Sequence, residues 1–333
     1  GEDGTVRVWD ATTGKPLRQL SGHTDWVRAV AWSPDGTRLL TGGEDGTVRV
    51  WDATTGKPLR QLSGHTDWVR AVAWSPDGTR LLTGSTDGAW VWDVATAEPL
   101  HQLSGHTGGV WALAWSPDGT RLLTGGEDAT VRVWDATTGK PLHQLSGHTD
   151  WVGAVAWSPD GTRLLTGGED GTVRVWDATT GKPLHQLSGH TDWVRAVAWS
   201  PDGTRLLAGG GDTVRVWDAT TGKPLRQLSG HTDWVRAVAW SPDSTRLLTG
   251  GADGARVWDA TSGQPLGFTV VTLPRGEIAV FDAITDQLVR ASAGAWRWLG
   301  YNVVEDGRLT RLPAESFGSL PSLHPAARSA ESA

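Results

Sequence analysis

A unit of about 42 residues that ends in Val-Trp-Asp recurs along this chain, and its copies are nearly identical. Successive Trp-Asp pairs begin at Trp9, Trp51, Trp92, Trp134, Trp176, Trp217 and Trp258, at steps of 42, 41, 42, 42, 41 and 41 residues. A Gly-His pair keeps the same step, with histidines at His23, His65, His106, His148, His190 and His231. A period of this length is typical of a chain that folds as an array of similar units.

Each unit predicts four short strands and no helix. In the unit that starts at His23, strands are expected over 27–32, 38–41, 47–51 and 59–62, separated by the turn sequences Ser-Pro-Asp-Gly, Glu-Asp-Gly and Thr-Thr-Gly-Lys-Pro. One such antiparallel sheet cannot bury both of its faces, whereas sheets stacked radially cover one another. The sequence therefore predicts an all-β propeller, most simply of seven blades, with eight as the alternative.

The His, Thr, Asp and Trp marks closely resemble the WD40 β-propeller family over residues 1 to about 266. The resemblance implies a buried hydrogen-bonded relay within each blade, which falls here on His23, Thr41, Asp45 and Trp51. A later unit repeats it as His148, Thr166, Asp170 and Trp176. In the unit of His190, Ala208 replaces the hydroxyl, and we expect that relay to be broken at a cost of about 1 to 3 kcal/mol.

Catalysis and metal binding are both disfavoured by the repetition itself. A Thr, His and Asp set invites a hydrolase interpretation, but an enzyme has little use for six copies of one active site. One histidine per blade also keeps these side chains far apart around a ring, and zero Cys excludes disulfides and thiolate metal sites. We expect no enzyme activity, no metal and no cofactor.

A second set of tryptophans precedes each Ser-Pro-Asp turn, where the family usually has Phe packed between blades. We expect all of them to lie in the core: Trp32, Trp74, Trp115, Trp157, Trp199 and Trp240.

The positions that differ between units carry the functional information. By resemblance to the family, three positions in each unit reach the top face of the propeller, around the mouth of the channel. They read Trp26, Arg28, Glu44; Trp68, Arg70, Thr86; Gly109, Trp111, Glu127; Trp151, Gly153, Glu169; Trp193, Arg195, Gly211; and Trp234, Arg236, Ala252. Exposed Trp and Arg are typical of protein-binding hot spots, so we expect a partner here. The alternative is that Trp and Arg merely stack on one another.

This ring is not uniform. Arg28, Arg70, Arg195 and Arg236 form one arc, while the opposite arc lacks Arg and keeps Glu127 and Glu169. We therefore expect a polarised face on which an acidic or carboxylate-bearing partner docks towards the Arg arc. Anion or nucleic-acid binding through that arc is an alternative, although a net charge of −7 with interspersed signs makes nucleic acid a poor candidate.

The ends of the chain complete the expected domain organisation. Residues 1–22 are expected to be a partial blade, 23–266 six regular repeats, 267–310 a degenerate closing blade completed by material from residues 5 to 20, and 311–333 a tail. All of 1–310 is expected to form one propeller, monomeric as a fragment. Gly1–Gly4 repeats the sequence of residues 43–46, so we expect a piece of a longer protein.

The expected function is a non-catalytic protein-interaction or sensor scaffold. Near-identical units resemble the recently amplified WD40 arrays of bacterial NLR-like (STAND) signalling ATPases, or of kinase-fused proteins, in which the propeller is a C-terminal sensor. That resemblance implies an N-terminal effector or nucleotide-switch domain and a cytoplasmic location. No apolar run is long enough to span a bilayer. A propeller hosting an unrecognised enzymatic site is the remaining alternative.

Overall fold

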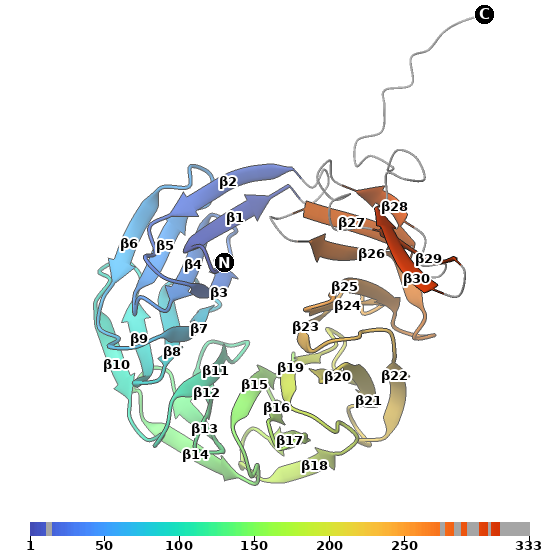
Figure 1. Cartoon of the computed structure of the whole chain (residues 1–333). Helices are drawn as coiled ribbons and strands as arrows, with labels where there is room; N and C mark the ends of the chain where they lie inside the picture. The colour runs from blue at the N-terminus through green and yellow to red at the C-terminus, as the bar shows by residue number, and fades with distance from the viewer. Residues whose placement is uncertain (11–14, 274–276, 283–287, 292–299, 306–307, 314–333) are drawn as a thin grey trace, which may run out of the picture.

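The computed structural model describes residues 1–10, 15–273, 277–282, 288–291, 300–305 and 308–313, in which all regular secondary structure is β-strand. Six successive units each form a four-stranded antiparallel meander, and these sheets stand side by side around a common axis (Figure 1). The first strand of each unit lies nearest this axis and the fourth lies on the outer rim. The predicted all-β propeller is confirmed.

The six complete blades have closely matching bounds. Blade one contains β3 (Val27–Trp32), β4 (Arg38–Gly43), β5 (Val48–Asp52) and β6 (Pro58–Leu62); blade two contains β7 (Val69–Trp74), β8 (Arg80–Ser85), β9 (Gly88–Asp93) and β10 (Pro99–Leu103). Blade three contains β11 (Val110–Trp115), β12 (Arg121–Gly126), β13 (Thr130–Asp135) and β14 (Pro141–Ser146); blade four contains β15 (Val152–Trp157), β16 (Arg163–Gly168), β17 (Val173–Asp177) and β18 (Pro183–Leu187). Blade five contains β19 (Val194–Trp199), β20 (Arg205–Gly210), β21 (Thr213–Asp218) and β22 (Pro224–Leu228); blade six contains β23 (Val235–Trp240), β24 (Arg246–Gly251), β25 (Gly254–Asp259) and β26 (Pro265–Leu273).

A seventh position in the ring holds the hairpin of β1 (Thr5–Trp9) and β2 (Pro16–Ser21), which corresponds to the two outer strands of a blade (Figure 1). The expected closing blade from 267–310 is not formed as a separate sheet. Instead β27 (Glu277–Asp282) and β28 (Leu288–Ala291) extend the sheet of blade six beyond β26. The reason is local: β26 is nine residues long, and its far half pairs with β27 across a short connection that costs little loop entropy.

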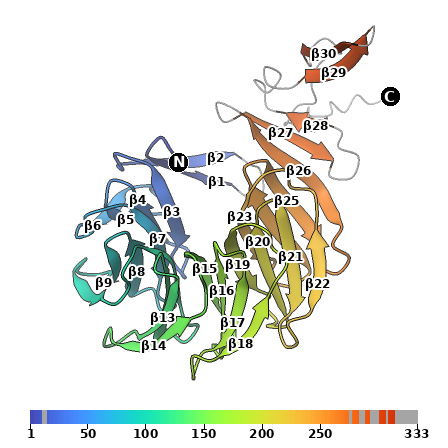
Figure 2. The same cartoon turned by 60° about the horizontal axis from the view of Figure 1, so that its bottom comes forward.

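The structure describes only part of the C-terminal region that follows β28. β29 (Gly300–Glu305) and β30 (Arg308–Pro313) form a two-stranded sheet that lies away from the blades in Figure 2. Residues 292–299 of the expected closing blade lie outside the described residues. The expected tail begins within β30, and residues 314–333 lie outside the described residues.

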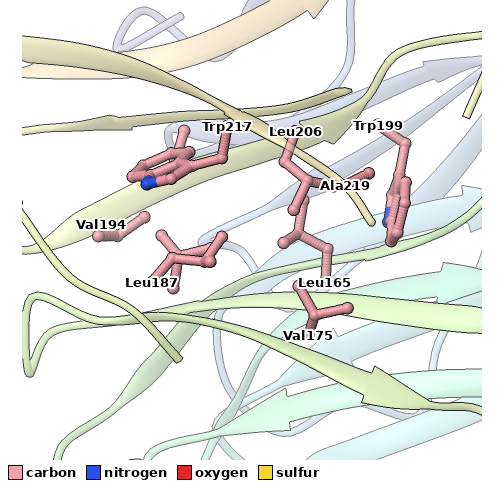
Figure 3. Packing of buried hydrophobic residues seen from close by; sticks show 10 residues of the cluster. Leu165, Val175, Leu187, Val194, Trp199, Leu206, Trp217 and Ala219 are labelled. Carbon is pink, nitrogen blue, oxygen red and sulfur yellow. The ribbon is translucent and has the colours of Figure 1, made fainter. Parts of the chain in front are cut away.

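The hydrophobic core lies between blades as well as within them. Figure 3 shows one cluster, in which Leu165 and Val175 of blade four pack with Val194, Trp199 and Leu206 of blade five. All of these side chains are buried. Similar clusters join the neighbouring blades, so each sheet depends on the next for the burial of its face.

An arginine from each of blades one to five covers the first-strand tryptophan of the next blade. The guanidinium carbon of Arg163 lies 4.7 Å from the ring centre of Trp199, and its nitrogens donate to the carbonyls of Ala219 (2.7 Å) and Gly203 (3.4 Å) in blade five. Stacking of the same kind places Arg38 on Trp74, Arg80 on Trp115, Arg121 on Trp157 and Arg205 on Trp240. We call these pairs the inter-blade clamps.

The expectation that all six of these tryptophans are buried is wrong for Trp32. Trp74, Trp115, Trp157 and Trp199 are 7–8% exposed, and Trp240 is half-buried, whereas Trp32 is 54% exposed. The clamp arginine comes from the second strand of the preceding blade. The β1–β2 hairpin before blade one has no such strand, so nothing from it covers Trp32.

The relay predicted by family resemblance has continuous hydrogen-bonding geometry. In blade one, Trp51 Nε1–H donates to Thr41 Oγ1 (2.9 Å), which lies 2.7 Å from His23 Nε2, and His23 Nδ1 lies 3.0 Å from Asp45. Blade four repeats this with Trp176, Thr166, His148 and Asp170. Because burial lowers the pKa of His23, the imidazole is neutral and can accept from the hydroxyl at Nε2 while donating to the carboxylate at Nδ1.

Blade five lacks this relay at both ends of its histidine. Ala208 provides no hydroxyl, and Asp212, which occupies the position of the relay carboxylate, is not hydrogen-bonded to His190. His190 Nε2 is therefore buried without a hydrogen-bond partner, whereas Nδ1 lies 3.2 Å from the hydroxyl of Thr213 and interacts with the backbone of Gly210. Burial, together with the positive charge of Arg215, lowers the pKa of His190 to about 4.

Restoring the hydroxyl is expected to stabilise blade five. Ala208 pairs with Val197 in the register that Thr41 keeps with Val30, so Ala208→Thr places its oxygen where His190 Nε2 lacks a partner. We expect a gain of about 1 to 3 kcal/mol in the free energy of unfolding, and a comparable loss for the reverse change Thr166→Ala in blade four. Urea unfolding followed by circular dichroism measures both. Equal midpoints for Ala208→Thr and the parent would contradict the account of a missing hydroxyl donor to His190.

The unpaired histidine also predicts a pH dependence. The folded state holds the pKa of His190 near 4, against an ordinary value of 6.5, so between these pH values the unfolded chain binds the proton more tightly. Stability is therefore present above pH 6.5 and falls as the pH drops, by up to about 3 kcal/mol at pH 4. His190→Gln should flatten this dependence relative to the parent chain in urea titrations across that range. Parallel curves for the two proteins would contradict the prediction.

The inter-blade clamps predict unequal effects of two chemically identical substitutions. Arg163→Ala removes two hydrogen bonds and the contact with Trp199, and should cost about 1 to 3 kcal/mol. Arg246 occupies the same strand position in blade six but stacks on no tryptophan among the described residues, so Arg246→Ala should cost less than about 0.5 kcal/mol. Thermal unfolding of both variants measures the difference, and equal losses would argue against the clamps.

Candidate interaction surface on the top face

The top face is the end of the propeller where each first strand begins and where the turn between the second and third strands lies. Topology brings the three variable positions of each unit together there. In blade one the amide of Glu44 donates to the carbonyl of Trp26 at 2.8 Å, and blades three and four have matching bonds from Glu127 to Gly109 and from Glu169 to Trp151. The acidic position is thereby fixed against the start of the first strand.

A β-bulge directs the Arg position towards this face. In blade one, Val27 pairs with Gly43 and Ala29 with Gly42, so that Arg28 is the extra residue in β3. The same register shift occurs in all six first strands, at Arg28, Arg70, Trp111, Gly153, Arg195 and Arg236. A bulge removes a residue from the regular alternation and re-aims its side chain. The variable residue of each unit is therefore not part of the alternation that directs side chains of the first strand into the core.

In blade one the Arg is held by both of its partners. The guanidinium of Arg28 lies 4.5 Å from the ring centre of Trp26, its Nε donates to Glu44 Oε1 (2.6 Å), and a second nitrogen lies 2.5 Å from the same oxygen. The carboxylate of Glu44 is largely covered by this contact, with 8% of its side chain exposed.

Elsewhere on this face, Arg is held between two indoles. The guanidinium of Arg70 lies 4.8 Å from the ring centre of Trp68 and 3.8 Å from that of Trp111 in the next blade. Arg195 lies likewise between Trp193 (4.8 Å) and Trp234 (4.4 Å). Partial burial lowers the pKa of Arg70 and Arg195, although both remain charged at neutral pH. Arg and Trp side chains therefore do stack on one another on this face, and this contact restricts the orientation of the indoles.

The Arg ring is interrupted at blades three and four. Here Trp111 and Trp151 pack together with ring centres 5.3 Å apart, and the indole N–H of Trp111 donates to Glu127 (2.7 Å). Next to them lies a hollow of about 80 Å³, lined by Trp111, Trp151, Gly153, Glu169, Val194 and Arg195. The hollow exists because Gly153 has no side chain where other units carry Arg or Trp.

A larger cavity of about 600 Å³ lies at the opposite end of the blades. Its lining includes Arg38, Gly78, Asp93 and Val94, and it coincides with the position where blade two departs from the repeat after its Trp-Asp pair. None of the predicted partner-binding residues borders it. The top-face hollow is smaller but is surrounded by the positions that vary between units, which makes it the better candidate.

A scan of the chain against family models matches the WD domain, G-beta repeat, at residues 14–52, 56–93, 97–135, 139–177, 181–218 and 222–259. The chain belongs to the WD40 repeat family. WD40 repeats form protein-interaction scaffolds. Each of the six matched ranges contains the fourth strand of one sheet and the first three strands of the next blade.

Individual WD40 proteins resemble this chain over about one repeat. Nuclear distribution protein PAC1 of Coccidioides posadasii is 54% identical over 41 residues, which are 12% of this chain and 9% of that protein. Ribosome assembly protein 4 of Saccharomyces cerevisiae is 49% identical over 39 residues, 12% of this chain and 8% of that protein. The aligned part is thus less than a tenth of each relative.

Two further findings concern the described part of this WD40 propeller. It contains no group of three or more His, Asp and Glu side chains that could hold a metal ion. It also contains no helix long and apolar enough to cross a membrane.

The residues predicted for partner binding lie on the top face, but the contacts between residues of neighbouring units were not foreseen. Sequence reasoning treated Trp26, Arg28 and Glu44 as three positions of one unit, whereas Arg70 reaches across to Trp111 of the next unit. The inter-blade clamps were also missed. One signal could have revealed them: an Arg follows every Ser-Pro-Asp turn at a constant distance from the tryptophan before it.

Proposed function

We propose that this propeller is a non-catalytic binding module that takes up a protein partner on its top face. The observation that carries the proposal is the exposure of indoles on one face of a rigid ring: Trp68 is 40% exposed, and Trp151 and Trp193 are 37% exposed. An exposed indole whose orientation is already fixed loses little side-chain freedom when a partner covers it. Trp and Arg are also the residues most enriched in protein-binding hot spots.

We further propose that the partner presents acidic groups to the Arg arc. Arg28 is already paired with Glu44, so the available positive charge comes from the other members of the arc. Partial burial is the main cause of the lowered pKa of Arg195, and the charge of Arg236 lowers it further, so the two guanidinium groups are close enough to repel; Arg236 is exposed. A carboxylate placed there would relieve this repulsion.

We also propose the class of full-length protein in which this propeller occurs. The near-identity of the units supports the resemblance to amplified sensor propellers of bacterial NLR-like ATPases or kinase-fused proteins, and with it an effector or nucleotide-switch domain and a cytoplasmic location. The relatives reported above are fungal and match about one repeat each, so they do not test this context.

Binding to the top face predicts a specific pattern of loss on mutation. A partner captured by the propeller from the native host and verified with purified components should lose roughly 30-fold in affinity with Trp193→Ala, the effect of a hot-spot tryptophan of about 2 kcal/mol. Charge reversal of Arg195 and Arg236 should weaken the same partner. Isothermal titration calorimetry provides the affinities.

The matched control is Leu184→Ala, because Leu184 is a comparably exposed apolar residue on the outer strand β18. It should leave the affinity unchanged. Equal losses for Leu184→Ala and Trp193→Ala, or no loss for either, would rule out the top face. A nucleic acid or other polyanion bound through the Arg arc would instead lose affinity steeply between 50 and 200 mM salt, which is about a 10³-fold effect for six phosphate contacts.

A further inference from the structure

Blade one contains an internal example of a guanidinium bound on the top face. Arg28 lies with its charged group over the ring of Trp26, and two of its nitrogens lie within 2.6 Å of one oxygen of Glu44. The indole supplies a face for stacking and the carboxylate supplies charge-assisted hydrogen bonds. These two side chains, held at the bulge in β3, are a complete site for a guanidinium.

Blade four has the same two side chains but no guanidinium between them. Trp151 and Glu169 occupy the positions of Trp26 and Glu44, and the amide of Glu169 donates to the carbonyl of Trp151 at 2.8 Å, as in blade one. The bulge is also present, with Gly153 as the extra residue. The hollow therefore coincides with the place that the Arg side chain fills in blade one.

The charged group next to the acid is also the same in blades one and four. In blade one the acid lies beside the Arg of the following blade, because Arg70 is affected by the charges of both Arg28 and Glu44. In blade four Arg195 has the same relation to Glu169. The presence of Arg195 at the edge of the hollow therefore does not exclude a second positive group, since blade one holds two.

Glu169 differs from the other two top-face glutamates in its contacts. Glu44 accepts from Arg28, and Glu127 accepts from the indole of Trp111 and from the amide of Gly109 (3.1 Å). The carboxylate of Glu169 has no hydrogen bond or ion pair within the described part of the chain. Burial raises its pKa, opposed by the charge of Arg195, so an added positive group at this place would stabilise the ionised form.

We infer that the hollow at Gly153 binds a guanidinium from outside, the side chain of an arginine in a protein partner, stacked on Trp151 and paired with Glu169. This inference rests on the proposed function, because it names one chemical group of the top-face partner. An arginine fits better than a lysine, since the planar guanidinium stacks on an indole and offers two N–H groups to one carboxylate. The partner then presents an arginine to blade four and acidic groups to the Arg arc.

The first experiment uses the full chain with nitrogen-15 in its tryptophans and the probe peptide acetyl-Gly-Arg-Gly-amide at millimolar concentrations. The indole signal of Trp151, assigned by its loss in Trp151→Phe, should shift saturably. The same peptide with citrulline, which keeps the shape but has no charge, should bind at least ten-fold more weakly, and the lysine peptide should fall between them. Equal binding of the arginine and citrulline peptides would overturn the inference.

Substitution at the hollow provides the second test. Gly153→Arg should place the chain's own guanidinium in the site and abolish the peptide-induced shift, whereas Gly153→Ala should retain it. There is space for the change, because a Cβ at Gly153 would meet only the carbonyl oxygen of Val194, at 3.9 Å. Glu169→Gln should reduce the preference for arginine over citrulline without filling the hollow. Unchanged peptide binding in both Gly153→Arg and Glu169→Gln would overturn the inference.

The two proposals can fail separately. A verified partner that depends on Trp193 but binds Gly153→Arg as tightly as the parent would leave the top-face function standing and reject the arginine site. Peptide binding at Gly153 together with a partner that ignores every top-face substitution would reject the proposed function and retain the site.

Discussion

The structure depends on burial between neighbouring blades. A four-stranded sheet of this size has two faces to cover, and each blade covers one face of the next with aliphatic side chains, as the cluster of blades four and five shows in Figure 3. The clamp arginines complete the same interface, each stacking on a tryptophan that belongs to the following blade. Trp32 shows what happens without a preceding second strand, because its indole is more than half exposed.

Repetition at the core leaves the top face free to vary. The bulge in each first strand takes one residue out of the alternating pattern, so that Arg, Trp or Gly can occupy it while the pairing on either side stays the same. Arg28, Arg70 and Arg195 at this position stack on indoles and restrict their orientation. Gly at this position leaves a hollow with its carboxylate unpaired. Differences between units therefore change the chemistry of the face with little change in the sheet beneath it.

Much of the fold could be predicted from the sequence, because its period, turn residues and alternating strands all point to the same architecture. The top-face positions could be predicted only through family resemblance. What could not be predicted are contacts between units, since the position of Arg70 relative to Trp111 depends on how two sheets pack. The path of the C-terminal strands was also missed, because residues 277–282 carry no repeat mark and β26 offers them a nearby edge.

The incomplete relay of blade five has a consequence for the cooperativity of the whole array. In a chain whose units contact only their neighbours, unfolding begins where the sum of a unit's own stability and its interfaces is smallest. An internal weak unit divides such an array into two cooperative blocks, here blades one to four and blade six. Amide hydrogen exchange in this propeller would then reveal a subglobal opening centred on β19–β22, adjacent to the hollow at Gly153.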